Sequence, residues 1–522
     1  RTMLRTGYVN GDGFTSELSP GYHRYPFIGM MRAAGVARRA GIDFYREQRF
    51  KAMFDLPLKI MLPDLTLPRL NDGGSVSLAS EEWVSLYEEA SSWYGDENYL
   101  ALLNMIYRAG LKRNSIAALL HGRKELPPLT LILGESQFLP HSGAAMLRSP
   151  LNDWNLYLKN DRGESGHRHP DALNMLLFAN GEEAFPGTGS PLYGDAAYLQ
   201  WYTQTIAHNT LTLNTASQRL RPLKKAPELG LSHWGVSAAQ AAAEQPPALL
   251  RRTLVMTPRA IVDIFRVTSP ETVSVADWTL HLNGALSADA HAEKSADALI
   301  PADRLTALQS AKQYWPHQGY KYLTDLMALP ADRDLHATLT QPKGGKVDIW
   351  LAPAISGGKL YRANGPGIES GQKMPLLLQR REELTGSVFT AVYAPYQHRP
   401  TVRSVRFLTP STSAEQTAVE ITHQHGKDLI LSAAPPQKFS QGGATLDGAL
   451  GCEIQHAGGQ LVLLRGREWK SIGLEITLAE AGEIIINLSG SEPQIHNAGN
   501  QSVKGIIKIN GREKTFATPP AR

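Results

Sequence analysis

Apolar side chains recur at helical spacing through the first part of the chain, between about residues 25 and 120. The i, i+3, i+4 and i+7 pattern is followed by Tyr99, Leu102, Leu103 and Ile106, and again by Trp83, Leu86, Tyr87 and Ala90. This spacing predicts amphipathic helices that pack on one another. Two prolines and two glycines between residues 62 and 74 exclude a helix there and predict an ordered loop.

After Pro127 and Pro128 the pattern changes to short β-type runs separated by turn residues. Such runs occur at 210–213, 260–265, 390–393, 429–431, 461–464 and 484–486. Helices followed by strands, without alternation, predict an all-α domain joined to a large β-sandwich assembly. We place the helical unit at residues 1–127, the central sheet unit at 128–408 and the C-terminal sheet unit at 409–522. A groove between the helices and the sheets would suit a long ligand.

Composition narrows the class of protein. The 522 residues are 42% hydrophobic and 20% charged, and the chain contains no apolar run of the ~18 residues that a membrane span needs. The net charge of +4 comes from scattered basic residues, which argues against a nucleic-acid partner and leaves room for a compact anionic ligand. The single cysteine, Cys452, excludes an intrachain disulfide.

Imidazoles gather in two short segments, residues 166–174 and 207–210. His167 and His169 are alternate residues and would face one side of a strand, where they could transfer protons, bind a carboxylate or hold a metal. His169 and His208, with a carboxylate such as Asp171 or Asp195, could ligate a metal. A hydrogen-bonded histidine network explains the same residues equally well.

Two tyrosines are candidate acid or base groups. Tyr22 directly precedes the first predicted helix, next to Pro20 and Gly21, and Tyr193 lies in a Gly-rich loop that would return to the histidines. A nearby cation would favour the phenolate, which can then exchange protons with a substrate. Packing roles are the plainer alternative, and Tyr198 and Tyr202 compete with Tyr193.

Arginines near these motifs could bind carboxylates or sulfates bidentately. Asn71 and Asp72 have the composition of turn formers. As candidate substrate-binding residues we take His23, Arg24, Asn71, Arg168, Asn174 and Tyr202.

Several motifs together resemble the heparinase II/III-like polysaccharide lyases, including the related exolytic alginate lyases, over most of the chain. They are DGFTSELSPGYHRY at 12–25, HRHPDALN at 167–174, QTIAHNT at 204–210, VDIFRV at 262–267 with DWTLH at 277–281, and VYAPY at 392–396. The resemblance implies a partial, N-terminally incomplete (α/α) toroid followed by antiparallel β-sheet domains, with the substrate cleft between them.

The resemblance also implies a reaction. A uronate carboxylate is neutralised, its C5 proton is removed, and the C4 glycosidic bond breaks by β-elimination. By position Tyr22 resembles the tyrosine that protonates the leaving oxygen, His167 the histidine near the carboxylate, and Tyr193 the tyrosine that serves as base. Relatives place a further Asn or His on an earlier helix, in a segment that would precede Arg1.

No cofactor is required for this chemistry. His169 and His208 fall where relatives hold a structural zinc together with an aspartate, but here Phe185 to Thr188 occupy the place of that aspartate. The resemblance thus implies a structural zinc or another divalent metal at His169 and His208, with the aspartate ligand replaced.

We therefore expect a lyase acting on an acidic, uronate-containing polysaccharide or oligosaccharide, without a nucleic-acid or membrane partner. The family's polymeric substrates imply a periplasmic or secreted bacterial protein. Two alternatives stay open: a uronate C5-epimerase, which returns the proton to the opposite face, and a non-catalytic acidic-glycan-binding protein.

Overall fold

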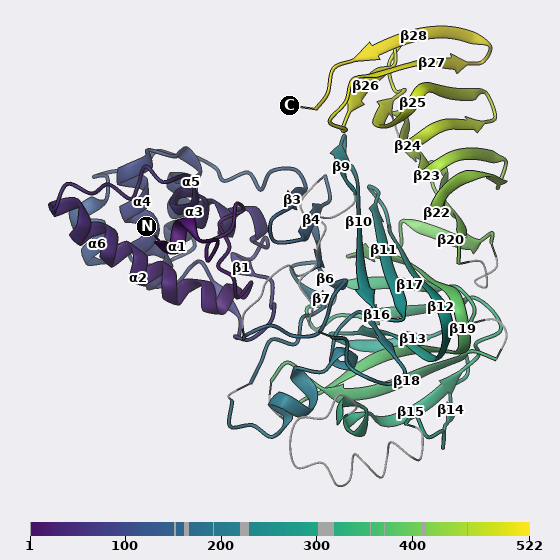
Figure 1. Cartoon of the computed structure of the whole chain (residues 1–522), viewed down its shortest axis with the longest axis horizontal. Helices are drawn as coiled ribbons and strands as arrows, with labels where there is room; N and C mark the ends of the chain where they lie inside the picture. The colour runs from purple at the N-terminus through teal and green to yellow at the C-terminus, as the bar shows by residue number, and fades with distance from the viewer. Residues whose placement is uncertain are drawn as a thin grey trace.

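The computed structural model describes residues 2–150, 153–160, 166–191, 193–219, 229–300, 318–354, 357–369, 371–409, 414–456 and 458–521. The N-terminal part is helical and lies to one side of the sheets (Figure 1). Its elements are α1 (Thr2–Arg5), α2 (Pro20–Arg39), α3 (Gln48–Ile60), β1 (Thr66–Leu67), β2 (Val76–Ser77), α4 (Glu81–Tyr94), α5 (Glu97–Arg108) and α6 (Ile116–His121). None of the described helices is long and apolar enough to cross a membrane.

The start of α2 differs from the prediction. The side chain of Ser19 accepts a hydrogen bond from the backbone N–H of Tyr22, and Pro20 occupies the first turn, where its missing N–H costs nothing. The helix therefore begins before Tyr22, and this tyrosine stands on its first turn instead of preceding it. A helical first turn holds the phenol more rigidly than the predicted turn would.

A five-stranded antiparallel sheet lies between the helices and a larger sheet. Its strands are β3 (Gln137–Leu139), β4 (Ala144–Arg148), β5 (Trp154–Lys159), β6 (Asn174–Ala179) and β7 (Glu182–Phe185), in that order. Alternate side chains enter different cores: Met146 and Tyr157 pack with the helices, whereas Leu147 and Leu156 pack with the larger sheet. Because successive strand residues point to opposite faces, one buried sheet joins both cores.

The larger sheet has twelve strands, and every described pairing in it is antiparallel. They are β8 (Leu211–Leu213), β9 (Leu229–His233), β10 (Val236–Gln245), β11 (Ala248–Met256), β12 (Ile261–His281), β13 (Ala285–Ala288), β14 (Glu293–Lys294), β15 (Thr324–Leu329), β16 (Leu335–Thr340), β17 (Lys346–Leu351), β18 (Lys359–Pro366) and β19 (Lys373–Tyr396). Short helical turns η1 (Tyr198–Tyr202), η2 (Thr205–Ala207) and η3 (Gln318–Tyr322) lie at one end.

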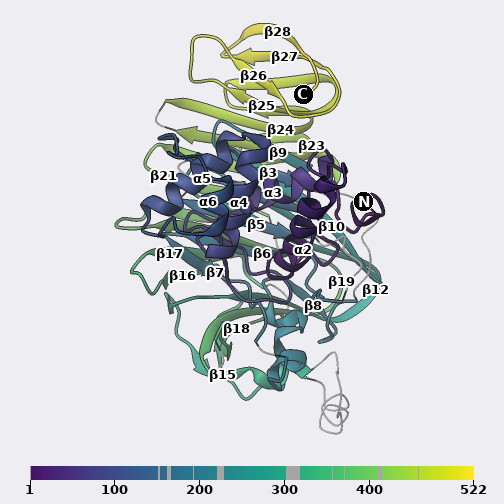
Figure 2. The same ribbon diagram turned by 90° about the vertical axis from the view of Figure 1, so that its left-hand side faces the viewer.

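The C-terminal sheet has nine strands and stands at the upper end of the view in Figure 1, while Figure 2 shows the helices in front of the sheets. Its strands are β20 (Val402–Phe407), β21 (Gln416–His423), β22 (Gly426–Gln441), β23 (Ala444–His456), β24 (Gly459–Ser471), β25 (Leu474–Asn487), β26 (Gln494–Asn497), β27 (Val503–Ile509) and β28 (Arg512–Thr518). Val262 and Ile264 of β12 share a core with Ile430 and Leu463 of this sheet.

The predicted fold class is confirmed at the level of a helical N-terminal part followed by mostly antiparallel sheets. The β-type runs predicted at 210–213, 260–265 and 390–393 fall in β8, β12 and β19. The unit boundaries at residues 127 and 408 stay predictions.

Candidate active site

The carboxylate of Asp72 is the centre of a cluster that joins the helical part to the sheets. Its Oδ2 accepts hydrogen bonds from His167 Nδ1 at 3.0 Å, Tyr198 Oη at 2.8 Å and Tyr193 Oη at 3.2 Å. Its Oδ1 lies 2.9 Å from His169 Nε2. Only 1% of this residue is exposed, so four donors from the β part hold one buried carboxylate.

The segment that carries His167 and His169 is irregular, so the predicted strand is wrong. It links β5 to β6, and Asp72 N donates to His167 O at 3.0 Å. The two imidazoles nevertheless act on the same partner, because they bind opposite oxygens of Asp72. The carboxylate, and not a pleated backbone, sets their common direction.

The two candidate phenols meet above this cluster. Tyr22 Oη hydrogen-bonds Tyr193 Oη, and the Tyr22 ring stacks on the His167 ring with centroids 3.6 Å apart. Tyr193 Oη also lies 3.1 Å from His167 Nδ1. Helix α2, the 166–174 segment and the Gly-rich loop thus bring three groups, far apart in sequence, to one point.

The electrostatics of the cluster follow from burial and from hydrogen bonding. Burial alone would raise the pKa of Asp72, but hydrogen bonds from His169, His167 and Tyr198 outweigh it and lower the pKa. Desolvation, the bond to Tyr22 and the charge of Asp72 raise the pKa of Tyr193. At neutral pH the site therefore holds an ionised Asp72 beside a protonated phenol of Tyr193.

A second buried network lies behind the first. Asn71, at a positive φ of 58°, accepts hydrogen bonds from His169 N at 3.1 Å and from Lys159 Nζ at 2.5 Å. The ammonium of Lys159 also pairs with the carboxylate of Asp171, and both side chains are almost completely buried. Burial opposes ionisation of Asp171, yet the charge of Lys159 lowers its pKa to about 2. Lys159 therefore ties the Asp72 loop to the histidine segment.

The predicted metal ligands lie close together in this network. The His169 and His208 ring centroids are 5.3 Å apart, and His169 Nδ1 and His208 Nε2 are buried without a hydrogen-bond partner among the described residues. His208 Nδ1 lies 3.6 Å from Asp171 Oδ2 and 3.5 Å from Thr188 Oγ1. Among the described residues no group of three or more His, Cys, Asp or Glu could hold a metal. The two imidazoles alone are an incomplete zinc donor set, and metal binding stays a prediction.

The predicted substrate-binding residues differ in accessibility. Arg24 is partly exposed and pairs with Glu82, and Arg168 is half-buried beside His167. His23 is fully buried among Phe14, Phe27 and Trp83 in the helical core, where its side chain packs against aromatic rings.

Three further predicted binding residues are also enclosed and hold structure together. Asn71 Nδ2 donates to Leu18 O at 2.8 Å, Asn174 Nδ2 donates to Asp171 at 2.8 Å, and Tyr202 Oη donates to Gly367 O at 2.8 Å. Asn71, Asn174 and Tyr202 are each about 2% exposed. Direct substrate contact by these side chains is not supported, since their polar atoms are engaged inside the protein.

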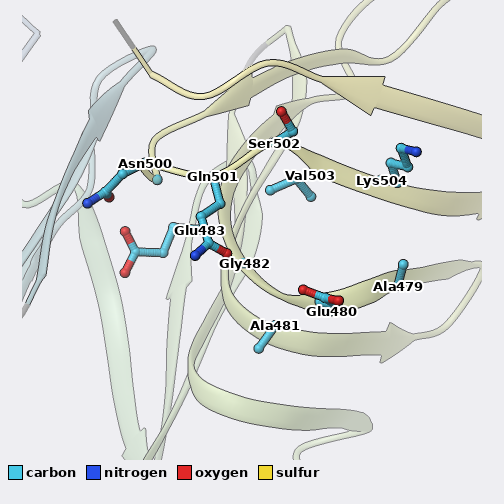
Figure 3. A pocket seen from close by; sticks show the side chains of 11 residues that line it. Ala479, Glu480, Ala481, Gly482, Glu483, Asn500, Gln501, Ser502, Val503 and Lys504 are labelled. Carbon is cyan, nitrogen blue, oxygen red and sulfur yellow. The ribbon is translucent and has the colours of Figure 1, made fainter.

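A cavity of about 420 Å³ opens beside Tyr22, between α2, the loop that follows Asp72 and the start of α4. A second cavity of about 630 Å³ lies in the C-terminal sheet, where Figure 3 shows Glu480 and Glu483 of β25 and Lys504 of β27. The lining of this second cavity has neither histidine nor tyrosine. The first cavity is therefore the one that adjoins the proton-transfer groups.

Comparison with known proteins assigns most of the chain to one family. Residues 132–422 match the family model Heparinase II/III-like, C-terminal, and residues 6–101 match Heparinase II/III N-terminus. A heparin-sulfate lyase of Pedobacter heparinus is 27% identical over 220 residues, which are 40% of this chain and 30% of that protein. An exo-oligoalginate lyase of Saccharophagus degradans is 31% identical over 157 residues, 26% of this chain and 21% of that protein.

Solved structures agree on the fold. The heparan sulfate lyase HepC from Pedobacter heparinus aligns with a TM-score of 0.59 at 17% identity, over 83% of this chain and 61% of that chain. A heparinase III, the BT4657 gene product, aligns with a TM-score of 0.59 at 15% identity, over 83% and 59%. The matches thus span less than a third of the two curated relatives and about three fifths of these structures.

Proposed function

Because the chain belongs to the heparinase II/III-like family, we propose that it is a polysaccharide lyase that cleaves a uronate-containing acidic glycan by β-elimination. The names of its relatives, a heparin-sulfate lyase and an exo-oligoalginate lyase, support this reaction class. The observation that carries the proposal is the contact between Tyr22 Oη and Tyr193 Oη above the Asp72–His167 pair. Two phenols in contact can serve two neighbouring atoms of one sugar ring.

In the proposed reaction, Tyr193 as phenolate takes the C5 proton, and the electron pair of that bond forms the C4–C5 double bond. The C4–O bond breaks, and Tyr22 gives its proton to the departing oxygen. The hydrogen bond between the phenols then passes the abstracted proton from Tyr193 to Tyr22, so the pair regains its starting state. His167 stacks on Tyr22 and would face the uronate carboxylate, whose negative charge must be quenched before C5 can lose a proton.

The raised pKa of Tyr193 sets a condition on this scheme. The phenol must lose its proton before it can act as a base, and the charge of Asp72 opposes that loss. Because the pKa of the phenol is raised, its phenolate, once formed, is a stronger base toward a weakly acidic C–H bond. We therefore expect kcat/KM to rise toward alkaline pH.

The phenol contact favours elimination over C5 epimerisation. An epimerase must remove a proton from one face of the sugar and return one to the other, whereas the two Oη atoms here touch each other and approach a ring from one side. A glycan-binding protein without activity would need neither phenol.

We also infer that the helices are part of an (α/α) toroid and that the sheets form β-sandwich domains, as the family resemblance implies. A polymeric substrate further suggests a periplasmic or secreted protein, which fractionation of the source cells would test.

The experiment is incubation with alginate, hyaluronan, heparan sulfate and chondroitin sulfate, followed by ultraviolet absorbance of the unsaturated uronate. The proposal predicts new absorbance and shorter chains with at least one glycan. Shortening without absorbance would indicate hydrolysis, and inversion at C5 without shortening would indicate an epimerase. Tyr22→Phe should abolish the absorbance signal and spare glycan binding. A Tyr22→Phe protein that keeps both the signal and the binding would contradict catalysis by this site.

A further inference from the structure

The cavity beside Tyr22 has the size and position of a second sugar site. Its volume of about 420 Å³ lies within the range of ~300–1,000 Å³ typical of small-molecule sites. Tyr22 and Gly21 line it from the first turn of α2, and residues 73–77 line it from the loop that follows Asp72. The same loop thus supplies Asp72 to the tyrosine cluster and a wall to the cavity.

Two glycines fix this arrangement. A Cβ atom on Gly21 would come within 3.1 Å of Gly73 Cα, and Gly73 has a φ of +110°, a conformation that favours glycine. Gly73 N also donates to Ser190 Oγ at 2.9 Å, in the loop that carries Tyr193. The cavity is therefore held at a set place relative to both phenols.

The lining offers groups that suit a sugar ring. Tyr25 is 61% exposed at the cavity edge, its ring lies 5.8 Å from that of Tyr22, and the Arg24 guanidinium lies over it, 5.1 Å from the ring centroid. Ser80 and Trp83 also line the cavity, and their polar atoms, Ser80 Oγ and Trp83 Nε1, are buried without a hydrogen-bond partner among the described residues. Ser80 precedes α4 but makes no side-chain cap bond, unlike Ser19 at α2. Unpaired polar groups of this kind gain from a ligand oxygen.

The charges around the cavity do not favour a sulfate. Arg24 is the charged residue in its lining, and its guanidinium already pairs with the carboxylate of Glu82, which is 53% exposed. A sulfate would therefore meet a cation that is already paired with a carboxylate, whereas hydroxyl groups would not be repelled.

From this lining we infer that the cavity binds the sugar ring that departs when the glycosidic bond breaks, and that this ring is unsulfated. The inference rests on the proposed function, because Tyr22 is the group assigned to the departing oxygen. It adds Tyr25, Ser80 and Trp83 to the residues that recognise the substrate, and it names their ligand as a pyranose with free hydroxyl groups.

The test is calorimetric binding, which needs no turnover. Saturated tetrasaccharides of alginate, hyaluronan and unsulfated chondroitin are titrated into the full chain in a Tyr193→Phe background, where they are not cleaved during the titration, and the tightest one is kept. Tyr25→Ala should weaken its binding about 3- to 10-fold, because a ring-stacking contact is lost. Tyr25→Phe should restore it, and Leu119→Ala, at an exposed position on α6, is the matched control.

A second arm tests the exclusion of sulfate. Glu82→Gln should raise the binding of sulfated chondroitin tetrasaccharide relative to its unsulfated counterpart at least threefold, since it removes a carboxylate beside Arg24. The inference would be overturned by any of three results. They are no binding of any of the three probes, equal binding with and without Tyr25→Ala, and an unchanged ratio of sulfated to unsulfated chondroitin binding in Glu82→Gln. Normal probe binding without any lyase product would instead contradict the proposed function alone.

Discussion

Replacement of Asp72 by asparagine tests the site at its centre. Asparagine keeps the size of the aspartate side chain and one acceptor oxygen. This oxygen would best take the place of Oδ2, which now accepts hydrogen bonds from His167, Tyr193 and Tyr198. The new amide would then face His169 Nε2, whose proton can move to the unpartnered Nδ1. The variant should therefore fold, because every partner can still be satisfied.

The expected loss comes from the missing charge. A hydrogen bond to a charged group contributes about 1.5–3 kcal/mol, against about 0.5–1.5 kcal/mol for a neutral pair. Replacing one such charge-assisted bond by a neutral one in the reacting geometry removes about 1–1.5 kcal/mol, which would lower kcat/KM roughly 5- to 13-fold. Since the charge of Asp72 helps to raise the pKa of Tyr193, its removal should also move the alkaline rise in activity to lower pH.

The assay is the initial rate of unsaturated-uronate formation as a function of pH, with chemical unfolding as a check on folding. Asp64→Asn is the matched control, because Asp64 lies just before β1 on the segment that leads to Asp72, but is exposed and bonds only Thr66 among the described residues. Unchanged kcat/KM in a folded Asp72→Asn protein would contradict a role for the Asp72 charge in the reaction. So would a pH profile that moves in the opposite direction.

Three further outcomes are expected. Lys159→Met should lower the free energy of unfolding by about 3–5 kcal/mol in urea, because it leaves Asp171 buried and uncompensated, and Asp171→Asn added to it should recover part of the loss. Burial lowers the pKa of His281 to about 3, so its contribution to stability is complete above about pH 6.5 and is lost as pH falls toward 3. The free energy of unfolding should fall by up to about 1.4 kcal/mol per pH unit in this range, and a His281→Leu protein with the same pH slope would contradict this. Prolonged dialysis against a chelator should leave kcat intact, because no step needs a metal, and a loss that zinc restores would show that His169 and His208 hold one.

Local patterns were enough to predict the helical part and the strands, because each depends on spacing between near neighbours. Tyr22, His167 and Tyr193 could be singled out from residue type and family resemblance, and the structure brings them together. The sequence around Asp72 predicts a turn former, because nothing in Asn71-Asp72 indicates that donors about 95 and 121 to 126 residues later converge on it.

Burial was the second feature that sequence could not supply. His23, Asn174 and Tyr202 have the polar groups of binding residues, but the fold encloses them. Lys159 gave no signal at all, since a lysine at a strand end is ordinarily exposed, and its partner Asp171 lies across the next loop.

A crystal structure of the Tyr193→Phe protein with an acidic tetrasaccharide bound would show directly whether the two phenols act on one sugar ring. We expect a uronate with C5 facing position 193, its C4 oxygen within hydrogen-bond distance of Tyr22 Oη, and the departing ring against Tyr25. A uronate bound away from both positions, for example in the C-terminal cavity, would contradict it.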